Sequence, residues 1–119
     1  MTTIELICHI PEELRRENST SPRQLVRESG YMQHPEMVTL DALEVVLRVS
    51  PELVQDWLIY SSDKRSDSGW YFQEVKLTDH HKYIVGNIPD GETLIFFDPI
   101  KACCHFIVEE IAHISRNAA

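Results

Sequence analysis

The amino-acid sequence predicts an α+β fold with a helical N-terminal half, a three-stranded antiparallel meander and a C-terminal amphipathic helix packed on the sheet. Three observations support this prediction. Apolar residues recur at helical spacing up to residue 60, short β-type runs follow between residues 70 and 97, and a long apolar stripe begins after Pro99. Short connections favour antiparallel strands, and a three-stranded sheet needs a helix to keep one face dry.

The composition is that of a globular protein with an excess of acid. The chain has 119 residues and a formal net charge of -8, with 43% hydrophobic and 25% charged residues. We expect a single α+β domain over residues 1–119, because a boundary at the polar stretch 61–68 would leave two halves too small to be stable alone. The acid excess also argues against binding to the phosphate backbone of nucleic acids.

The cysteines and the N-terminus predict a cytoplasmic protein. Cys103 and Cys104 are neighbours and cannot form a disulfide with each other in a helix. A single bridge from Cys8 to one of them stays open, but we favour three reduced, buried thiols, because small secreted scaffolds carry more, evenly paired cysteines. Residues 4–10 are apolar but interrupted, without the basic leader of a signal peptide. No apolar run reaches the length of a membrane span.

Residues 4–10 fit two patterns, since they alternate as in a strand and also gather apolar side chains on one helical face. We favour a helix here and over Pro11–Arg16, because proline is tolerated at the first helical position. A further helix is predicted over Pro22–Ser29, with Ser21 as its cap and Gly30 at its end.

Two more helices are predicted between Thr39 and Leu58, the first capped by Thr39 and the second capped by Ser50 in a Ser-Pro turn. This segment resembles a helix-turn-helix, followed by strands as in a winged version. It departs from that motif at Glu44, where a small residue is usual, and at Arg48, where glycine is usual. The second helix would read DNA, and its outward residues include Glu52 and Asp56, which repel phosphates. We favour two antiparallel core helices and keep the winged helix-turn-helix as an alternative.

Three strands and a last helix are predicted after the polar stretch. The strands cover Trp70–Val75, Tyr83–Ile88 and Thr93–Phe97, with a Pro-Asp-Gly turn between the second and third. The helix begins at Asp98-Pro99 and should cover one face of the sheet. Its stripe consists of Ile100, Cys103, Cys104, Ile107, Val108, Ile111 and Ile114.

A partner-binding surface is predicted where the polar loop meets three consecutive aromatic residues. On a strand Trp70 faces one way and Tyr71 the other, so one core cannot hold both unless helices cover both faces of the sheet. Tryptophan, tyrosine and arginine are favoured at binding hot spots. We therefore expect Lys64, Arg65, Trp70 and Tyr71 to contact a partner, the alternative being that every ring is buried.

We expect neither a metal or other cofactor nor catalysis. His105, Glu109 and His113 share the polar side of the last helix, but metal sites draw their ligands from more than one element. We interpret these residues as a solvated face. The glycines match no phosphate-binding spacing, and the nucleophile and metalloprotease motifs are missing. A buried cysteine is unreactive, because burial disfavours the thiolate.

The sequence thus favours a small acidic protein that works without catalysis by binding a basic protein partner. Opposite charge speeds encounter and sets specificity. In composition alone the chain is similar to small acidic inhibitors such as toxin-neutralising immunity proteins. The alternatives are a winged helix-turn-helix-type DNA-binding regulator, although nucleic acid is not the favoured partner, and a metal- or small-molecule-binding domain. A homodimer is compatible with each reading.

Overall fold

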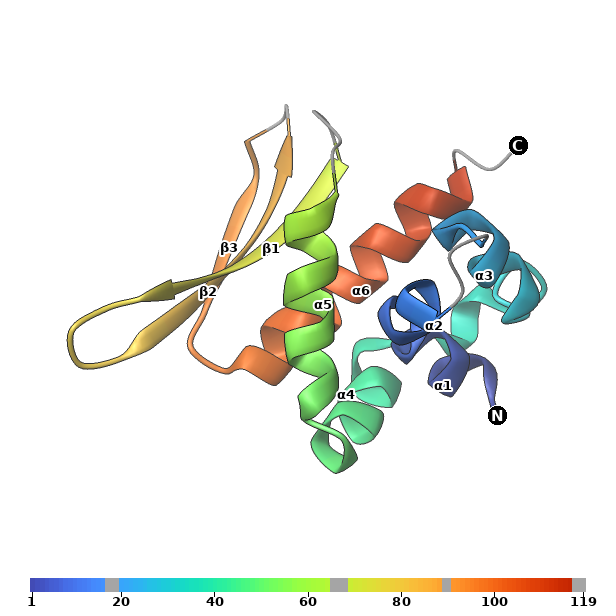
Figure 1. The fold of residues 1–119 in the computed structure, drawn as a ribbon, viewed down its shortest axis with the longest axis horizontal. Helices are drawn as coiled ribbons and strands as arrows, with labels where there is room; N and C mark the ends of the chain where they lie inside the picture. The colour runs from blue at the N-terminus through green and yellow to red at the C-terminus, as the bar shows by residue number, and fades with distance from the viewer. Residues whose placement is uncertain (17–19, 65–68, 89–90, 117–119) are drawn as a thin grey trace.

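Helices form the first half of the chain, and a sheet followed by one long helix forms the second (Figure 1). The computed structural model describes residues 1–16, 20–64, 69–88 and 91–116. The elements are α1 (Thr3–Cys8), α2 (Ile10–Arg16), α3 (Pro22–Glu28), the 3-10 turn η1 (Pro35–Met37), α4 (Leu40–Val49), α5 (Glu52–Asp63), β1 (Gly69–Lys76), β2 (His81–Ile88), β3 (Thr93–Phe96) and α6 (Pro99–Arg116).

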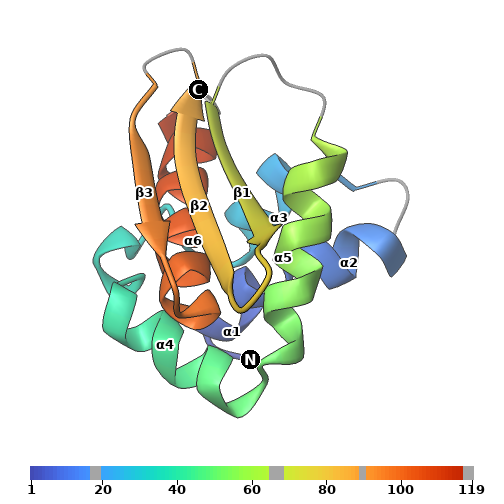
Figure 2. The same cartoon turned by 90° about the vertical axis from the view of Figure 1, so that its left-hand side faces the viewer.

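The three strands form an antiparallel sheet in the order β1-β2-β3. The C-terminal helix α6 packs on one face of this sheet, and α5 lies beside β1 (Figure 2). The predicted α+β fold, with its meander and its covering helix, is therefore confirmed. Residues 89 and 90 of the expected Pro-Asp-Gly turn lie outside the described residues.

The N-terminal segment is helical, so the strand alternative for residues 4–10 is wrong. Thr2 and Glu5 form a capping box, in which the Thr2 hydroxyl accepts from the Glu5 amide at 3.2 Å and the Glu5 carboxylate accepts from the Thr2 amide at 3.2 Å. The helix is interrupted at His9, and Ile7 and Ile10 on either side of the break are fully buried. A helix is favoured over a strand here because helical spacing places these side chains on one side of the segment, where they pack in the core.

The two central helices begin at different kinds of residue. Thr39 caps α4 as expected, because its hydroxyl accepts from the Ala42 amide at 3.1 Å. Ser50 provides no such cap for α5, which follows Pro51 without a side-chain cap. Buried leucines on both helices, Leu47 and Leu53 among them, belong to the common core.

The core lies between α6, α5, the inner face of the sheet and the N-terminal helices. Phe106 on α6 stacks on Phe72 of β1 with ring centroids 5.7 Å apart, and meets Trp57 of α5 edge-on at 5.9 Å. The Trp57 indole N–H donates to the Cys8 carbonyl at 3.0 Å, which ties α5 to α1. One aromatic cluster thus joins the two halves of the chain.

Candidate functional site

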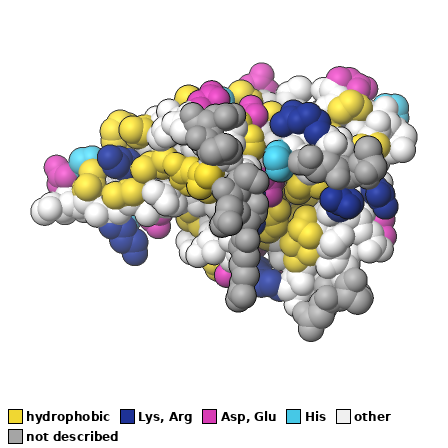
Figure 3. All heavy atoms as spheres, turned by 90° about the horizontal axis from the view of Figure 1, so that it is seen from above, with side chains coloured by type: hydrophobic (Ala, Val, Ile, Leu, Met, Phe, Trp, Pro, Cys, Tyr) yellow, Lys and Arg dark blue, Asp and Glu magenta, His cyan; other side chains and the backbone are white. Residues whose placement is uncertain are grey.

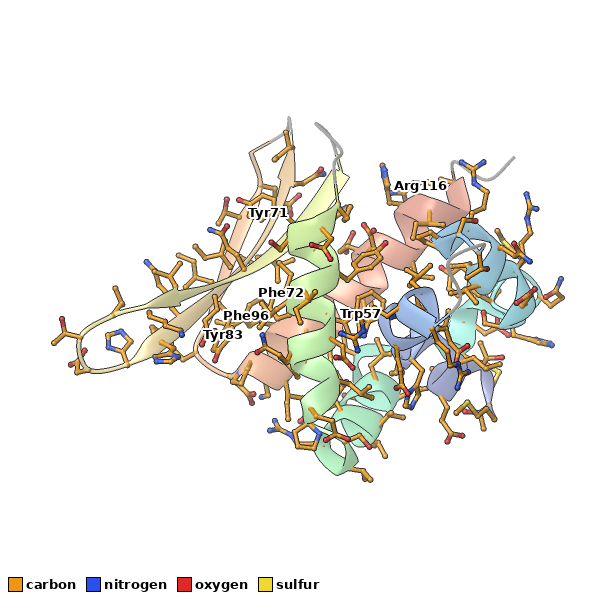
Figure 4. All side chains as sticks on the ribbon, viewed as in Figure 1. Trp57, Tyr71, Phe72, Tyr83, Phe96 and Arg116 are labelled. Carbon is orange, nitrogen blue, oxygen red and sulfur yellow. The ribbon has the colours of Figure 1, made fainter. Side chains whose placement is uncertain are left out.

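The strand register divides the sheet into a face that α6 covers and a face that α6 leaves open. Residues paired across antiparallel strands point to the same side. Phe72 pairs with Val85, and both are buried on the inner face. Tyr71, which precedes Phe72 in β1, points to the opposite side, away from Phe72, Tyr83 and Phe96 (Figure 4). The sheet therefore presents a second face, which we call the outer sheet face.

Large apolar side chains occupy the outer sheet face. The exposed fractions are 45% for Ile88, 56% for Ile95 and 69% for Phe97, while Tyr71 and Ile84 are half-buried. Seen from above, hydrophobic side chains run along the strands (Figure 3). Isolated exposed apolar residues are ordinary, whereas contiguous ones are typical of interaction surfaces. The outer sheet face is defined here as Tyr71, Ile84, Ile88, Ile95 and Phe97.

Gly86 allows the ring of Tyr71 to lie across the sheet. The two residues are register partners, and a Cβ added at Gly86 would overlap the hydroxyl end of the Tyr71 ring. A glycine inside a strand often marks such a close approach. The ring is thereby held flat on the outer sheet face, where its remaining exposed surface is available to a partner.

A groove runs between α5 and β1 at the border of the outer sheet face. Its volume is about 530 Å³. Tyr71 and Ile88 belong to both the groove and the face, so the two form one continuous surface. The lining comprises Gln55, Leu58, Ser61, Ser62, Tyr71, Phe72, Gln73, Glu74 and Ile88.

Side chains from α5 and from Lys64, the residue after it, cap the outer edge of β1. The Ser61 hydroxyl accepts from the Phe72 amide at 2.7 Å, and the Lys64 ammonium donates to the Trp70 carbonyl at 2.7 Å. A free strand edge is a template for pairing with another chain. Helix α5 closes this edge over the first half of β1.

Lys64 also reaches a buried carboxylate. Its ammonium donates to Glu110 at 2.8 Å, and Glu110 on α6 is only 2% exposed. The Tyr60 hydroxyl donates to the other Glu110 oxygen at 2.6 Å. Burial, followed by the neighbouring Glu110 charge, raises the pKa of Tyr60, so the phenol stays protonated as a donor. This triad is a structural link between α5, α6 and β1.

A smaller cleft of about 330 Å³ lies between α2 and α5, and Tyr60 and Lys64 form part of its wall. At its rim Arg15 pairs with Asp56 at 2.8 Å. Arg15 and Asp56 neutralise each other, and Lys64 is neutralised by Glu110. If the chain bound a small molecule, as in the alternative function, this cleft is where the ligand would lie.

The four residues expected to bind a partner lie in different environments. Tyr71 is on the outer sheet face, whereas Trp70 is 7% exposed and packs in the core. Lys64 is engaged by Glu110 and by the Trp70 carbonyl. Arg65 lies outside the described residues. Among the three expected residues that the structure describes, Tyr71 is therefore the one that lies on an open apolar surface.

The three candidate ligands on α6 are not gathered around a common point. The ring of His105 packs against Phe96 with centroids 4.9 Å apart, while His113 lies beside the backbone of Gly69. In the described part of the chain, no three side chains of His, Cys, Asp or Glu converge as a metal-binding group. The cysteines of this region are free and buried.

The exposed isoleucines and Phe97 were missed in the sequence analysis, although a signal was present. Residues 83–85 and 94–97 are apolar at consecutive positions, which predicts two apolar faces. A single C-terminal helix can cover one of them. Gly86, placed inside an apolar run, was a second signal for a close approach across the sheet.

Comparison with models of protein families, with curated proteins and with solved structures finds no match for this chain. Within residues 1–16, 20–64, 69–88 and 91–116, no helix has both the length and the apolar content needed to span a bilayer. A functional assignment therefore rests on the geometry of the surface itself.

Proposed function

We propose that this chain is a protein-binding module that recognises a basic protein partner through the outer sheet face. The observation that supports the proposal is the exposure of Ile88, Ile95 and Phe97 on one face of the sheet. Leaving these side chains in water is unfavourable by roughly 25 cal/mol for each Å² of apolar surface. A partner that covers them recovers this free energy, and the adjoining groove offers a place for a protruding side chain.

The charge of the chain supports a basic partner. The formal net charge is -8, and several cations are already neutralised within the molecule. Arg48 pairs with Glu44 and Asp98, and Lys64 pairs with Glu110. The acid excess is thus left to act on molecules that approach from solution. It attracts a positively charged protein and disfavours other acidic ones.

The proposal is tested by capturing partners from a native cell extract on three immobilised proteins. These are the wild type, Ile88→Lys on the outer sheet face, and Val45→Lys on the exposed side of α4. Both substituted residues are exposed, at 45% and 67%, and both variants change the net charge equally. We expect the wild type and Val45→Lys to retain the same basic protein and Ile88→Lys to lose it.

Raising the salt concentration should release that protein, because salt screens exposed charges. Equal capture by Ile88→Lys contradicts the proposal. So does the failure of the wild type and Val45→Lys to retain any common protein, or retention of an acidic one. Circular dichroism and thermal unfolding of each variant show that a loss of capture is not a loss of folding.

A further inference from the structure

The two edges of the sheet differ in how their backbone groups are satisfied. On β1 the outward Phe72 amide is bonded by Ser61 of α5, and the outward Trp70 carbonyl is bonded by Lys64, the residue that follows α5. On the other side β3 ends the sheet. Because α5 and Lys64 cap the first half of β1 and no element caps β3 among the described residues, strand addition is favoured at β3.

The register identifies which groups of β3 point outward. The Phe72 amide points away from β2, so Phe72 and Val85 are a non-hydrogen-bonded pair, and Val85 bonds instead toward β3. Its partner there is Leu94. The N–H and C=O of Leu94 are therefore used within the sheet, while those of Thr93 and Ile95 face outward. No hydrogen bond among the described residues occupies these outward backbone groups.

The side chains along this edge suit an added strand. Residues 93–97 carry no charge and no proline, the devices that commonly protect an edge. Ile95 and Phe97 project on the outer sheet face and are 56% and 69% exposed. A neighbouring strand would extend that face and pack its own alternate side chains against these two residues.

From this geometry we infer that β3 binds an extended segment of a partner protein by strand addition, with apolar residues facing Ile95 and Phe97 and a basic residue beside Glu92. The inference rests on the proposed function and specifies its binding mode. Glu92 is exposed at the start of the edge, whereas Asp98 after its end is paired with Arg48, so Glu92 and the formal net charge of -8 are what favour a basic residue there.

The same charges disfavour a second copy of this chain as the occupant. A two-fold pairing about Ile95 would place Glu92 of each copy opposite Asp98 of the other. Glu92 would then face another acidic side chain, whose charge Arg48 offsets in part, and like charges directly opposite each other destabilise a strand pair. Each copy also carries a formal net charge of -8, which opposes self-association. A basic foreign segment meets neither obstacle.

The test begins with peptides selected on the wild-type protein from a random peptide library. Two variants separate backbone from side-chain binding. Ile95→Pro removes the outward N–H and keeps the Leu94 bonds to β2, whereas Ile95→Thr removes the same apolar side chain but keeps the N–H. We expect selected peptides to bind Ile95→Pro at least about tenfold more weakly than Ile95→Thr.

A second measurement uses only the wild type, in case Ile95→Pro fails to fold. Binding should slow amide hydrogen exchange at Thr93 and Ile95 by at least about tenfold, because these amides become bonded. A peptide N-methylated at alternate residues should not bind, since its edge-facing donors are removed.

Equal binding to Ile95→Pro and Ile95→Thr, or unchanged exchange at Thr93 and Ile95, overturns strand addition. If Ile88→Lys still abolishes capture, the proposed function survives that outcome. Failure to select any peptide also overturns strand addition by short segments. A dimer seen by sedimentation and abolished in Ile95→Pro would replace the foreign segment by a second copy, which contradicts the assignment made here.

Discussion

At position 86, glycine weakens the strand but leaves room for the ring of Tyr71. A glycine inside a strand costs roughly 0.5–1 kcal/mol relative to alanine, but here a Cβ would overlap the Tyr71 ring. The φ angle of Gly86 is not positive, so alanine would meet the ring rather than backbone strain. We expect Gly86→Ala to reduce the free energy of unfolding by about 1 kcal/mol. With Tyr71→Ala the same change should raise it by roughly 0.5 kcal/mol.

Urea unfolding of the wild type, the two single variants and the double variant measures this coupling. An effect of the same sign in both backgrounds would show that the ring does not rest on Gly86. In that case Tyr71 would also lose its fixed place on the outer sheet face.

The buried thiols predict a loss of stability in alkaline solution. Burial raises the pKa of Cys8 and of Cys104 to about 12, from an ordinary value of 9.0. Above the ordinary value the unfolded chain releases thiol protons that the folded chain keeps, so the free energy of unfolding falls as pH rises between these limits. Each thiol contributes up to about 1.4 kcal/mol per pH unit.

Urea unfolding at about pH 8, 9 and 10 measures that decline, and Cys8→Ala should make it less steep. A thiol reagent should label none of the cysteines of the native protein and all of them in urea, because each is buried and free. Rapid labelling of the native protein would place at least one thiol at the surface.

At the scale of elements, the link between α5 and α6 depends on a buried pair of charges. Glu110 is 2% exposed, so removing its partner leaves a carboxylate inside the protein. We expect Lys64→Met to lower the free energy of unfolding by about 3 kcal/mol. Adding Glu110→Gln should restore most of this loss, since an amide oxygen can still accept from Tyr60.

Lys82→Met, at a half-buried lysine of β2, provides the comparison for loss of one positive charge, and it should cost less than about 1 kcal/mol. Thermal and urea unfolding of the variants give the values. Equal losses for Lys64→Met and Lys82→Met would mean that the pair does not hold the elements together.

Local sequence patterns predicted the helices and strands well. They could not predict which side chains from different elements contact each other. The stripe on α6 and the capped starts of α3 and α4 follow from local spacing and hydrogen bonding, and the structure contains them. Burial of Lys64 depends on Glu110, which is 46 residues away in sequence. No local rule could therefore separate Lys64, which is engaged in the core, from Tyr71, which is open on the outer sheet face.

The packing of α5 within the whole molecule argues against the helix-turn-helix alternative. Helix α4 lies within the segment Thr39–Leu58 that resembles this motif, and α5 begins in it, in the position of the reading helix, and extends to Asp63. The side chains of α5 that remain exposed include Glu52, Gln55 and Asp63, and its other sides pack against β1 and α2. The basic residues that the structure describes beside this helix are already paired, Arg15 with Asp56 and Lys64 with Glu110. A groove of DNA would therefore meet carboxylates.

We expect no detectable binding of random duplex DNA even at low salt, where nonspecific affinity is greatest. The physical reason is that nonspecific affinity comes from lysine and arginine contacts to phosphates, and this chain has a formal net charge of -8. Fluorescence anisotropy of a labelled duplex is the measurement, with a basic DNA-binding protein as positive control. Binding that weakens linearly with the logarithm of salt concentration would contradict the expectation. It would also require a basic surface from residues such as Arg23, Lys76 and Lys82, which lie on α3, β1 and β2, rather than from α5.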